Sequence, residues 1–476
     1  MSLSEMVSEM KKAGLVISGA VAGVMLSFGL SAFADDAAKQ ALPIAELNKL
    51  SQTFDVIKNN YVDPVKDDKL LEDAITGMVK ELDPHSEYYN EKDLGQFKED
   101  ISGKFSGIGA EVQAGKGAIL VVAPIEDTPA YKAGILAGDS IVKIDDAPVA
   151  NLSGLSAGIS KLRGKEGTPV KLTIVRQGES KPLVFNIIRA VIQSQSVKAK
   201  MIEPGYAWIR ITSFQDPTLK EFVEQAQKMY AQGDVKGIVL DLRNNPGGSL
   251  PVSIGVASAF LPQNVTVVSA KGRIDSANRV YKNEPSSYAT QGFQSDALKG
   301  LPAGMKNVPV VVLINGASAS ASEVVSGALQ DNKRATIMGI QSFGKGSVQT
   351  LFPLDSQGKT AVKITIARYY TPSGKSIQAR GVIPDVAVDE NADGRNPLYT
   401  READIQNHLS NDSGVAEEKP QDIWDKWIKQ EDDPDAAAKK DAKPKKFGDD
   451  DDFMLQQAIK QLKGLPVQKA KDTTAK

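Results

Sequence analysis

The chain has 476 residues, which is too long for one hydrophobic core and predicts roughly two to four domains. Its 57 lysines and arginines nearly balance 59 aspartates and glutamates, so the net charge of −2 gives no electrostatic reason to expect nucleic acid as a partner. There is no cysteine, and the two histidines, His85 and His408, are far apart. This excludes disulfides and thiol nucleophiles and disfavours a metal site or a histidine base, so we expect no metal and no cofactor.

The first 34 residues have the pattern of a targeting segment. Lys11 and Lys12 precede an uncharged stretch over residues 13–34, which ends in Ala-Phe-Ala before two aspartates. This is the order of a basic region, an apolar region and a cleavage site. The stretch is also long enough for a membrane span of about 20 residues. Residues 1–34 are therefore a signal peptide or a membrane anchor, and either predicts an exported protein, periplasmic or membrane-anchored facing the periplasm.

Residues 35–96 are predicted to be an N-terminal helical region. Apolar residues recur at helical spacing from Ile44 to Phe97, with breaks expected at residues 62–64 and 83–84. The simplest interpretation is a packing or dimerisation element without chemistry.

Residues 97–192 are predicted to be a β-rich unit. The unit opens with the glycine loop Gly107-Ile108-Gly109-Ala110. Runs rich in β-branched residues predict strands, and two helical patterns interrupt them. The expected strands cover residues 118–125, 140–149, 170–177 and 182–190, and the helical patterns cover 129–135 and 155–163.

Residues 193–390 alternate between strand and helix patterns. This βαβ rhythm predicts a largely parallel sheet covered by helices. Residues 391–476 then turn to charge and low complexity, which predicts a solvated linker before a last amphipathic helix that packs on the core or on a partner subunit. The expected strands are 206–214, 237–243, 309–316, 336–340, 347–354 and 361–370, and the helices 219–233, 249–261, 320–330 and 453–462.

Small residues dominate the turn over residues 315–323, between a buried strand and a helix. Small side chains allow a close approach, and the first N–H groups of a helix are free to stabilise negative charge. Ser320 is therefore a candidate nucleophile, with the N–H of Ala321 as an oxyanion donor. A helix N-cap with tight packing is the alternative.

The stretch over residues 339–347 nearly matches a phosphate-binding loop. Gly346 stands where a hydroxyl residue is required, and a strand follows instead of a helix, so a nucleotide site is excluded. Lys345 is a candidate base, because burial lowers the pKa of an amine and a neutral amine can take the proton of a serine. Two-residue alternation places Gln349 on the same strand face, where its amide can orient the amine. A solvated loop lysine is the alternative.

The stretch over residues 241–248 ends a strand and contains a Pro-Gly-Gly turn. Such a turn can direct backbone N–H groups into a cleft. Gly247 or Gly248 is therefore expected to supply a second oxyanion donor, while Asp241 and Arg243 hold the loop by charge pairing. Ligand sites gather at the carboxyl ends of parallel strands, so the three stretches are expected to meet.

With its GASASASE, SFGKGSVQ, DLRNNPGG and LDPHS motifs, the chain resembles the C-terminal processing peptidases, or tail-specific proteases, over about residues 45–388. The resemblance implies an exported serine endopeptidase of α/β multidomain architecture, with a protease core of βαβ units over residues 193–390. It implies that Ser320 is the nucleophile, Lys345 the general base and Gln349 its support. Ser318 and Ser322 would flank the nucleophile without replacing it.

The resemblance also implies that residues 97–192 are an inserted PDZ domain. The N–H groups of Gly107, Ile108, Gly109 and Ala110 would then capture the terminal carboxylate of a substrate whose tail adds a strand to the sheet. Expected partners are protein or peptide substrates with free apolar C-termini and a second copy of the chain through the terminal helices, with membrane anchoring by residues 13–34.

Two other functions stay open at this point. One is a PDZ adaptor whose protease-like domain has lost its activity. The other is a metal-dependent hydrolase, which the scarcity of histidine and cysteine disfavours.

Overall fold

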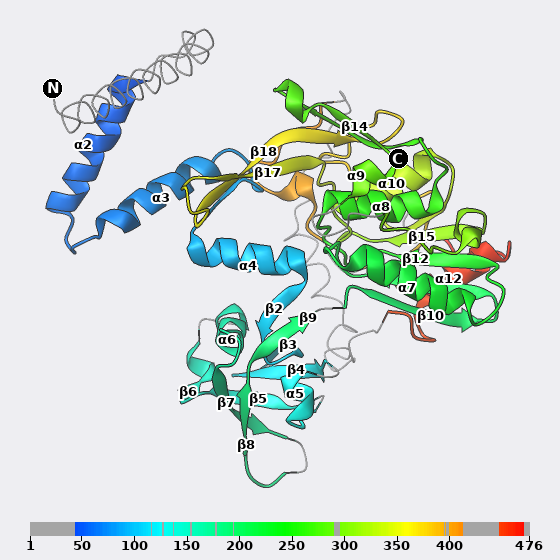
Figure 1. Cartoon of the computed structure of the whole chain (residues 1–476), viewed down its shortest axis with the longest axis horizontal. Helices are drawn as coiled ribbons and strands as arrows, with labels where there is room; N and C mark the ends of the chain where they lie inside the picture. Colours follow the sequence, from blue (N-terminus) through cyan, green and yellow to red (C-terminus); the bar gives the residue numbers. More distant parts are fainter. Residues whose placement is uncertain are drawn as a thin grey trace, which may run out of the picture. The chain divides into compact units, whose positions relative to one another are not determined.

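Figure 1 shows a computed structural model of the chain, in which most residues between Pro43 and Ala470 are described. The targeting segment predicted for residues 1–34 and much of the charged linker lie outside the described residues. The chain divides into two compact units after Ile75. Among the described residues, no helix is both long enough and apolar enough to span a bilayer. The described ranges are 43–470 without residues 116, 126–127, 137, 153–154, 177–178, 194, 290–295, 395, 397–398 and 413–446.

The first unit contains helix α2 (Ile44–Asn60) and the first turns of α3 (Asp67–Lys80). The break between them falls at the predicted position, and an ion pair of 2.7 Å joins Lys58 Nζ to Asp67 Oδ2 across it. Helix α2 has no buried side chain, and Ile44, Leu47 and Leu50 are all exposed. Its apolar face is therefore not covered by the described residues.

Strand β1 (Glu87–Tyr89) and helix α4 (Glu91–Ser102) precede the β-rich body of the second unit. Helix α4 continues past residue 97, where the β-rich region was expected to begin. It ends at Gly103, whose φ of 67° is left-handed and closes the helix.

The β-rich body is an antiparallel structure with its own core. Its main sheet has the order β3-β4-β5-β7-β8, with β6 beside β5, and β2 pairs separately with β9. Alternate strand residues such as Val121, Ile141 and Leu172 are buried and form the core. The elements are β2 (Lys104–Gly107), β3 (Ala110–Gly115), β4 (Ala118–Pro124), α5 (Pro129–Lys132), β5 (Ser140–Ile144), β6 (Ala147–Pro148), η1 (Val149–Asn151), α6 (Leu155–Leu162), β7 (Pro169–Val175), β8 (Leu183–Ile188) and β9 (Ala190–Gln193).

The α/β core is built on a sheet of order β10-β11-β12-β15-β16-β19, in which only β10 is antiparallel to its neighbour. One face of the sheet, including Ile238 and Leu240, packs on α7, α8 and α10, while the opposite face, including Val239, packs on α12 (Figure 1). The predicted parallel sheet is confirmed, and the last helix packs back on the core. The elements are β10 (Val197–Glu203), β11 (Tyr206–Ile211), α7 (Thr218–Tyr230), β12 (Gly237–Asp241), α8 (Leu250–Phe260), β15 (Val310–Ile314), α10 (Ala321–Asp331), β16 (Thr336–Gly339), β19 (Val386–Ala387) and α12 (Phe453–Leu462).

A second, antiparallel sheet has the order β1-β18-β13-β14, with β17 also paired to β18. The strands predicted at 347–354 and 361–370 belong to this sheet, because the short loop between them permits a hairpin but not a parallel crossover. The elements are β13 (Thr266–Gly272), η2 (Asp275–Ala277), β14 (Arg279–Lys282), α9 (Pro285–Tyr288), η3 (Ala303–Lys306), β17 (Ser347–Pro353), β18 (Ala361–Tyr370) and η4 (Glu402–Asp404).

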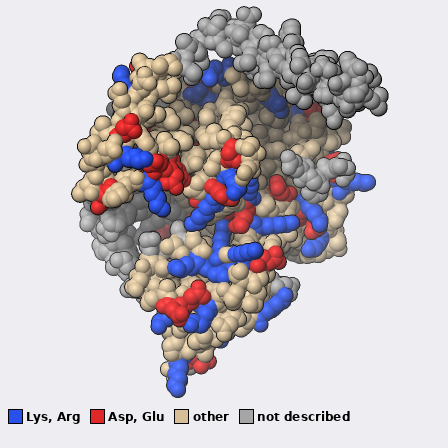
Figure 2. All heavy atoms as spheres, turned by 60° about the vertical axis from the view of Figure 1, so that its left-hand side comes forward, with Lys and Arg blue, Asp and Glu red and all other residues tan. Residues whose placement is uncertain are grey.

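Charged side chains of both signs are interspersed over the face drawn in Figure 2. Exposed cations pair with carboxylates, as Lys359 does with Glu91 at 3.1 Å. Such exposed pairs contribute little to stability, about 0–1 kcal/mol each.

Candidate active site

The candidate nucleophile lies in a strained turn. Ser320 follows the carboxyl end of β15 and is the N-cap of α10, with φ 53° and ψ −111°. A non-glycine residue with positive φ costs about 1–3 kcal/mol and persists only where its surroundings impose it. Strained backbone conformations of this kind are common at functional sites, so the geometry supports a functional role for Ser320.

The two neighbouring serines are used to build the turn. Ser318 is fully buried and donates its hydroxyl hydrogen to Leu242 O at 2.8 Å. Ser322 is fully buried as well and donates to Asn245 O at 2.9 Å. Ser320 is only partly buried, which leaves it as the serine of this turn that a substrate can reach.

Lys345 lies in the loop between β16 and β17, between two glycines that the surrounding backbone requires. A Cβ on Gly346 would lie 2.3 Å from Gln378 N, and one on Gly344, whose φ is 101°, would lie 3.1 Å from Arg380 N. Only glycine fits at both positions, so the path of the loop around Lys345 is closely fixed.

Burial lowers the pKa of Lys345, and the neighbouring Lys363 acts in the same direction. The carboxylates of Glu402, Asp83 and Glu323 oppose this effect without cancelling it. The amine is therefore easier to deprotonate than an ordinary lysine. Among the described contacts, no hydrogen bond joins Ser320 Oγ to Lys345 Nζ, so the two loops meet without the side chains being engaged.

One carboxylate connects the two loops. Glu323 is fully buried, and its Oε2 accepts hydrogen bonds from Ser320 N at 2.8 Å and from Lys345 N at 2.9 Å. Its Oε1 accepts from Gly344 N at 2.7 Å and from Ser342 Oγ at 2.6 Å. Burial raises the pKa of Glu323 to about 7, although these hydrogen bonds favour the ionised form. Sequence reasoning missed this residue, because a glutamate three residues after an N-cap serine is typical of an ordinary helix start.

Gln349 lies on β17, and its amide nitrogen donates to Ser347 Oγ at 2.8 Å and Thr365 Oγ1 at 3.0 Å. These bonds fix the amide and leave its oxygen as the group without a bond among the described residues. Lys345 precedes the first residue of β17, so the alternation of the strand does not by itself set the direction of the lysine side chain.

The Pro-Gly-Gly turn packs directly against Ser320, the candidate nucleophile. A Cβ on Gly247, whose φ is 105°, would lie 2.9 Å from Ser320 Cβ and 3.0 Å from Ala321 N. The N–H of Gly247 already donates to Asn245 Oδ1 at 2.9 Å. Within the described residues, the N–H groups of Gly248 and Ala321 donate to no other group. The geometry therefore favours Gly248 over Gly247 as the second oxyanion donor.

The buried charge pair predicted for this stretch is present and includes a third member. Arg243 donates to Asp241 Oδ1 and Oδ2 at 2.9 and 2.6 Å, and to both carboxylate oxygens of Asp452 at 2.8 and 2.6 Å. Burial alone would lower the pKa of Arg243, but the two carboxylates raise it. Asp452 also caps α12 by accepting from Leu455 N. The C-terminal helix is thus bound to the start of the glycine turn.

The LDPHS segment, interpreted above as packing, lies beside this site. Asp83 Oδ1 accepts from Thr365 Oγ1 at 3.1 Å, and Thr365 in turn accepts from Gln349. His85 Nε2 lies 2.7 Å from Glu402 Oε2, and Glu402 is fully buried. Sequence reasoning missed both contacts because the partners are hundreds of residues apart in the chain.

In the β-rich body, the glycine loop Gly107–Ala110 lies between β2 and β3. Ile108 is buried in the core, and its carbonyl accepts from Ala130 N at 2.7 Å. Gly109 has a φ of 79°, and a Cβ there would lie 2.3 Å from Thr128 Cβ. Gly107 ends β2 and Ala110 begins β3, so the loop joins the edges of two sheets.

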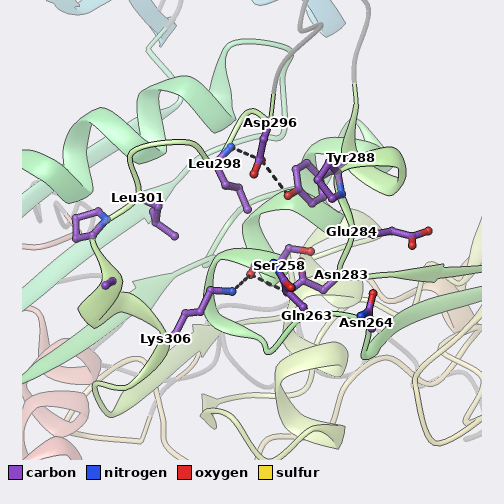
Figure 3. Close-up of a pocket in the computed structure, with 13 residues that line it drawn as sticks. Ser258, Gln263, Asn264, Asn283, Glu284, Tyr288, Asp296, Leu298, Leu301 and Lys306 are labelled. Carbon is purple, nitrogen blue, oxygen red and sulfur yellow. Dashed lines mark hydrogen bonds between the residues drawn. The ribbon is translucent and has the colours of Figure 1, made fainter.

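A hollow of about 290 Å³ lies at the C-terminal end of α8 (Figure 3). Its polar groups close that helix end: Lys306 Nζ donates to Leu261 O at 2.7 Å, and Asn283 Nδ2 donates to the same oxygen at 2.8 Å. The glycine turn precedes the other end of α8, about 15 Å along the helix. The hollow therefore belongs to the packing of α8, separate from the three predicted stretches.

In the part of the chain that the structure describes, no group of three histidine, cysteine, aspartate or glutamate side chains is placed to hold a metal ion.

Comparison with known proteins agrees with this architecture. Residues 205–388 match Peptidase family S41, residues 106–187 match the PDZ domain, and residues 22–93 match the activating protease CtpB N-terminal domain. The α/β core and the β-rich body thus define a serine-type peptidase with a PDZ domain.

The chain is 41% identical over 375 residues to a carboxy-terminal-processing protease of Bartonella bacilliformis, covering 78% of this chain and 82% of the relative. It is 34% identical over 346 residues to the carboxy-terminal processing protease CtpA of Bacillus subtilis, covering 72% and 69%. A solved structure, the photosystem II D1 C-terminal processing protease, shares 28% identity over 72% of this chain and 86% of that one, with a TM-score of 0.41. The chain belongs to the family of carboxy-terminal processing proteases.

Proposed function

We propose that this serine peptidase cleaves peptide bonds with a Ser–Lys dyad of Ser320 and Lys345. The observation that carries the proposal is the partly buried side chain of Lys345, whose pKa is lowered by burial, in a loop hydrogen-bonded through Glu323 to the Ser320 turn. Family membership establishes the peptidase class, and this contact supports the choice of Ser320 and Lys345.

In the proposed reaction, the neutral amine of Lys345 takes the proton of the Ser320 hydroxyl as its oxygen attacks the substrate carbonyl carbon. The N–H groups of Gly248 and Ala321 stabilise the negative charge that develops on the carbonyl oxygen. Lys345 then returns the proton to the leaving amine, and a water molecule releases the acyl group by the same steps in reverse.

Gln349 is proposed to orient the amine. Its nitrogen is held by two hydroxyl groups, so its oxygen is the part that can accept a hydrogen bond from Lys345. A neutral amide suits this role, because a carboxylate in its place would raise the pKa of the lysine.

The PDZ domain is proposed to bind the C-terminus of the substrate. We place it at residues 97–192, with the carboxylate held by N–H groups of Gly107–Ala110 and an apolar tail added to the sheet edge. Holding the tail on the same chain as the protease core, residues 193–390, raises the effective concentration of substrate.

Export, by cleavage of a signal peptide or by an anchor over residues 13–34, is part of the proposal, as is assembly through the terminal helices. The exposed apolar face of α2 supports assembly, because exposed contiguous apolar surface commonly marks an interaction site.

The decisive experiment compares Ser320→Ala and Lys345→Met with the wild type on a peptide that carries a free apolar C-terminus. Products are identified by mass spectrometry. Both variants should be folded and cleave at least about 1000-fold more slowly. Ser258→Ala, another buried serine at the far end of α8, is the matched control and should cleave normally. Wild-type cleavage by either dyad variant would show that the dyad is assigned wrongly.

A further inference from the structure

Glu323 is the one buried carboxylate, among the described residues, that bonds to the backbone of both dyad residues. Its four hydrogen bonds come from Ser320 N, Lys345 N, Gly344 N and Ser342 Oγ, all between 2.6 and 2.9 Å. Two of the donors belong to residues that the proposed mechanism uses, and the other two lie in the loop that carries the base.

We propose that Glu323 is a positioning residue that sets the separation of nucleophile and base by binding both backbones with one carboxylate group. This inference rests on the proposed dyad of Ser320 and Lys345. Glu323 touches no reacting atom and acts only through the two residues that it holds.

The chemistry of the contacts requires a carboxylate. Three of the four donors are backbone N–H groups, which cannot accept a hydrogen bond. Both oxygens of the side chain must therefore be acceptors, which only the ionised acid provides. An amide of the same size offers one oxygen, so its NH₂ group necessarily faces one pair of donors.

The rest of the site increases the importance of this bridge. Ser320 has a strained backbone, and without a bond to hold its N–H the turn can relax away from φ 53°. No described hydrogen bond joins Ser320 Oγ to Lys345 Nζ, so the side chains do not hold the loops together. The carboxylate is completely buried, and water cannot replace its bonds.

The test measures kcat and KM of Glu323→Gln on the C-terminal peptide substrate. Loss of the bonds on one side of the carboxylate should lower kcat about 100-fold or more and leave KM within about threefold, because substrate binding does not use this residue. Glu221→Gln is the matched control. Its Oε2 accepts from the backbone N–H groups of Ser196 and Val197, at 2.8 and 3.1 Å, but it contacts neither dyad residue. Its kcat should stay within about threefold of the wild type.

A folded Glu323→Gln enzyme with wild-type kcat overturns the inference, as does a loss confined to KM or a kcat loss matched by the Glu221 control. If Glu323→Gln does not fold, Glu323→Asp decides: it keeps the charge but is one methylene shorter and cannot span both loops. A folded aspartate variant with reduced kcat and normal KM supports positioning, and one with wild-type kcat refutes it. Activity in Ser320→Ala or Lys345→Met would instead refute the proposed dyad, whatever Glu323 does.

Discussion

Replacement of Gly247 by alanine tests whether the glycine turn and the nucleophile turn are in direct contact. The added Cβ would lie 2.9 Å from Ser320 Cβ and 3.0 Å from Ala319 O. The left-handed φ of 105° adds strain of about 1–3 kcal/mol, and overpacking adds about 1–3 kcal/mol more. Gly247→Ala should therefore lower the free energy of unfolding by about 2–6 kcal/mol. A shift of Ser320 by about 1 Å would also reduce kcat about 100-fold.

The matched control is Gly374→Ala. Gly374 also has a left-handed φ, 83°, but a Cβ there would meet no heavy atom within 4 Å. It should show the strain alone, about 1–3 kcal/mol, with normal kcat. Urea unfolding and peptide cleavage, measured on both variants, separate the effect of backbone strain from the effect of the steric clash with Ser320. Equal destabilisation of the two variants, together with wild-type kcat for Gly247→Ala, would refute the contact.

Three other predictions follow from the charges and the close contacts. Burial lowers the pKa of Lys345 and raises the pKa of Glu323 to about 7. Because the deprotonated forms of both residues favour cleavage, kcat should rise with pH across neutrality. A flat or falling profile of kcat against pH would contradict this. Asp452→Ala leaves buried Arg243 with one carboxylate and should destabilise the protein by about 3–5 kcal/mol in urea unfolding, whereas unchanged stability would show that the contact contributes nothing. In Gly109→Ala, the added Cβ does not fit against Thr128. This variant should bind C-terminal peptides more weakly in a fluorescence anisotropy titration, while kcat at saturating substrate stays normal. Unchanged affinity would argue against the loop as the binding site.

Periodicity in the sequence was sufficient to predict the parallel sheet and its covering helices. The runs over 238–240 and 310–314 are apolar at every position because helices cover both faces of the sheet, and this continuous pattern is unambiguous. Strands β13 and β14 were not predicted. They form part of an antiparallel sheet that takes its other members from both sides of the PDZ domain, and no local pattern encodes such pairing.

The candidate site was predictable where a short motif carries its own geometry. The turn at Ser320 and the glycines around Lys345 are local features, and the structure shows why those small residues are needed there. The residues that surround the candidate dyad, such as Glu323 and Asp83, were not predictable in the same way. Glu323 reaches the base loop, and Asp83 reaches Thr365, through contacts that only the folded chain creates.

The bond between Arg243 and Asp452 spans 209 residues of sequence. A chain is synthesised from its N-terminus, so strand β12 and Arg243 are made well before Asp452, the acid that Arg243 binds. Any fragment that ends before Asp452 keeps the Ser320 and Lys345 loops in its sequence but leaves a buried guanidinium half satisfied. Full pairing of the buried arginine next to the candidate site is thereby tied to synthesis of the last helix.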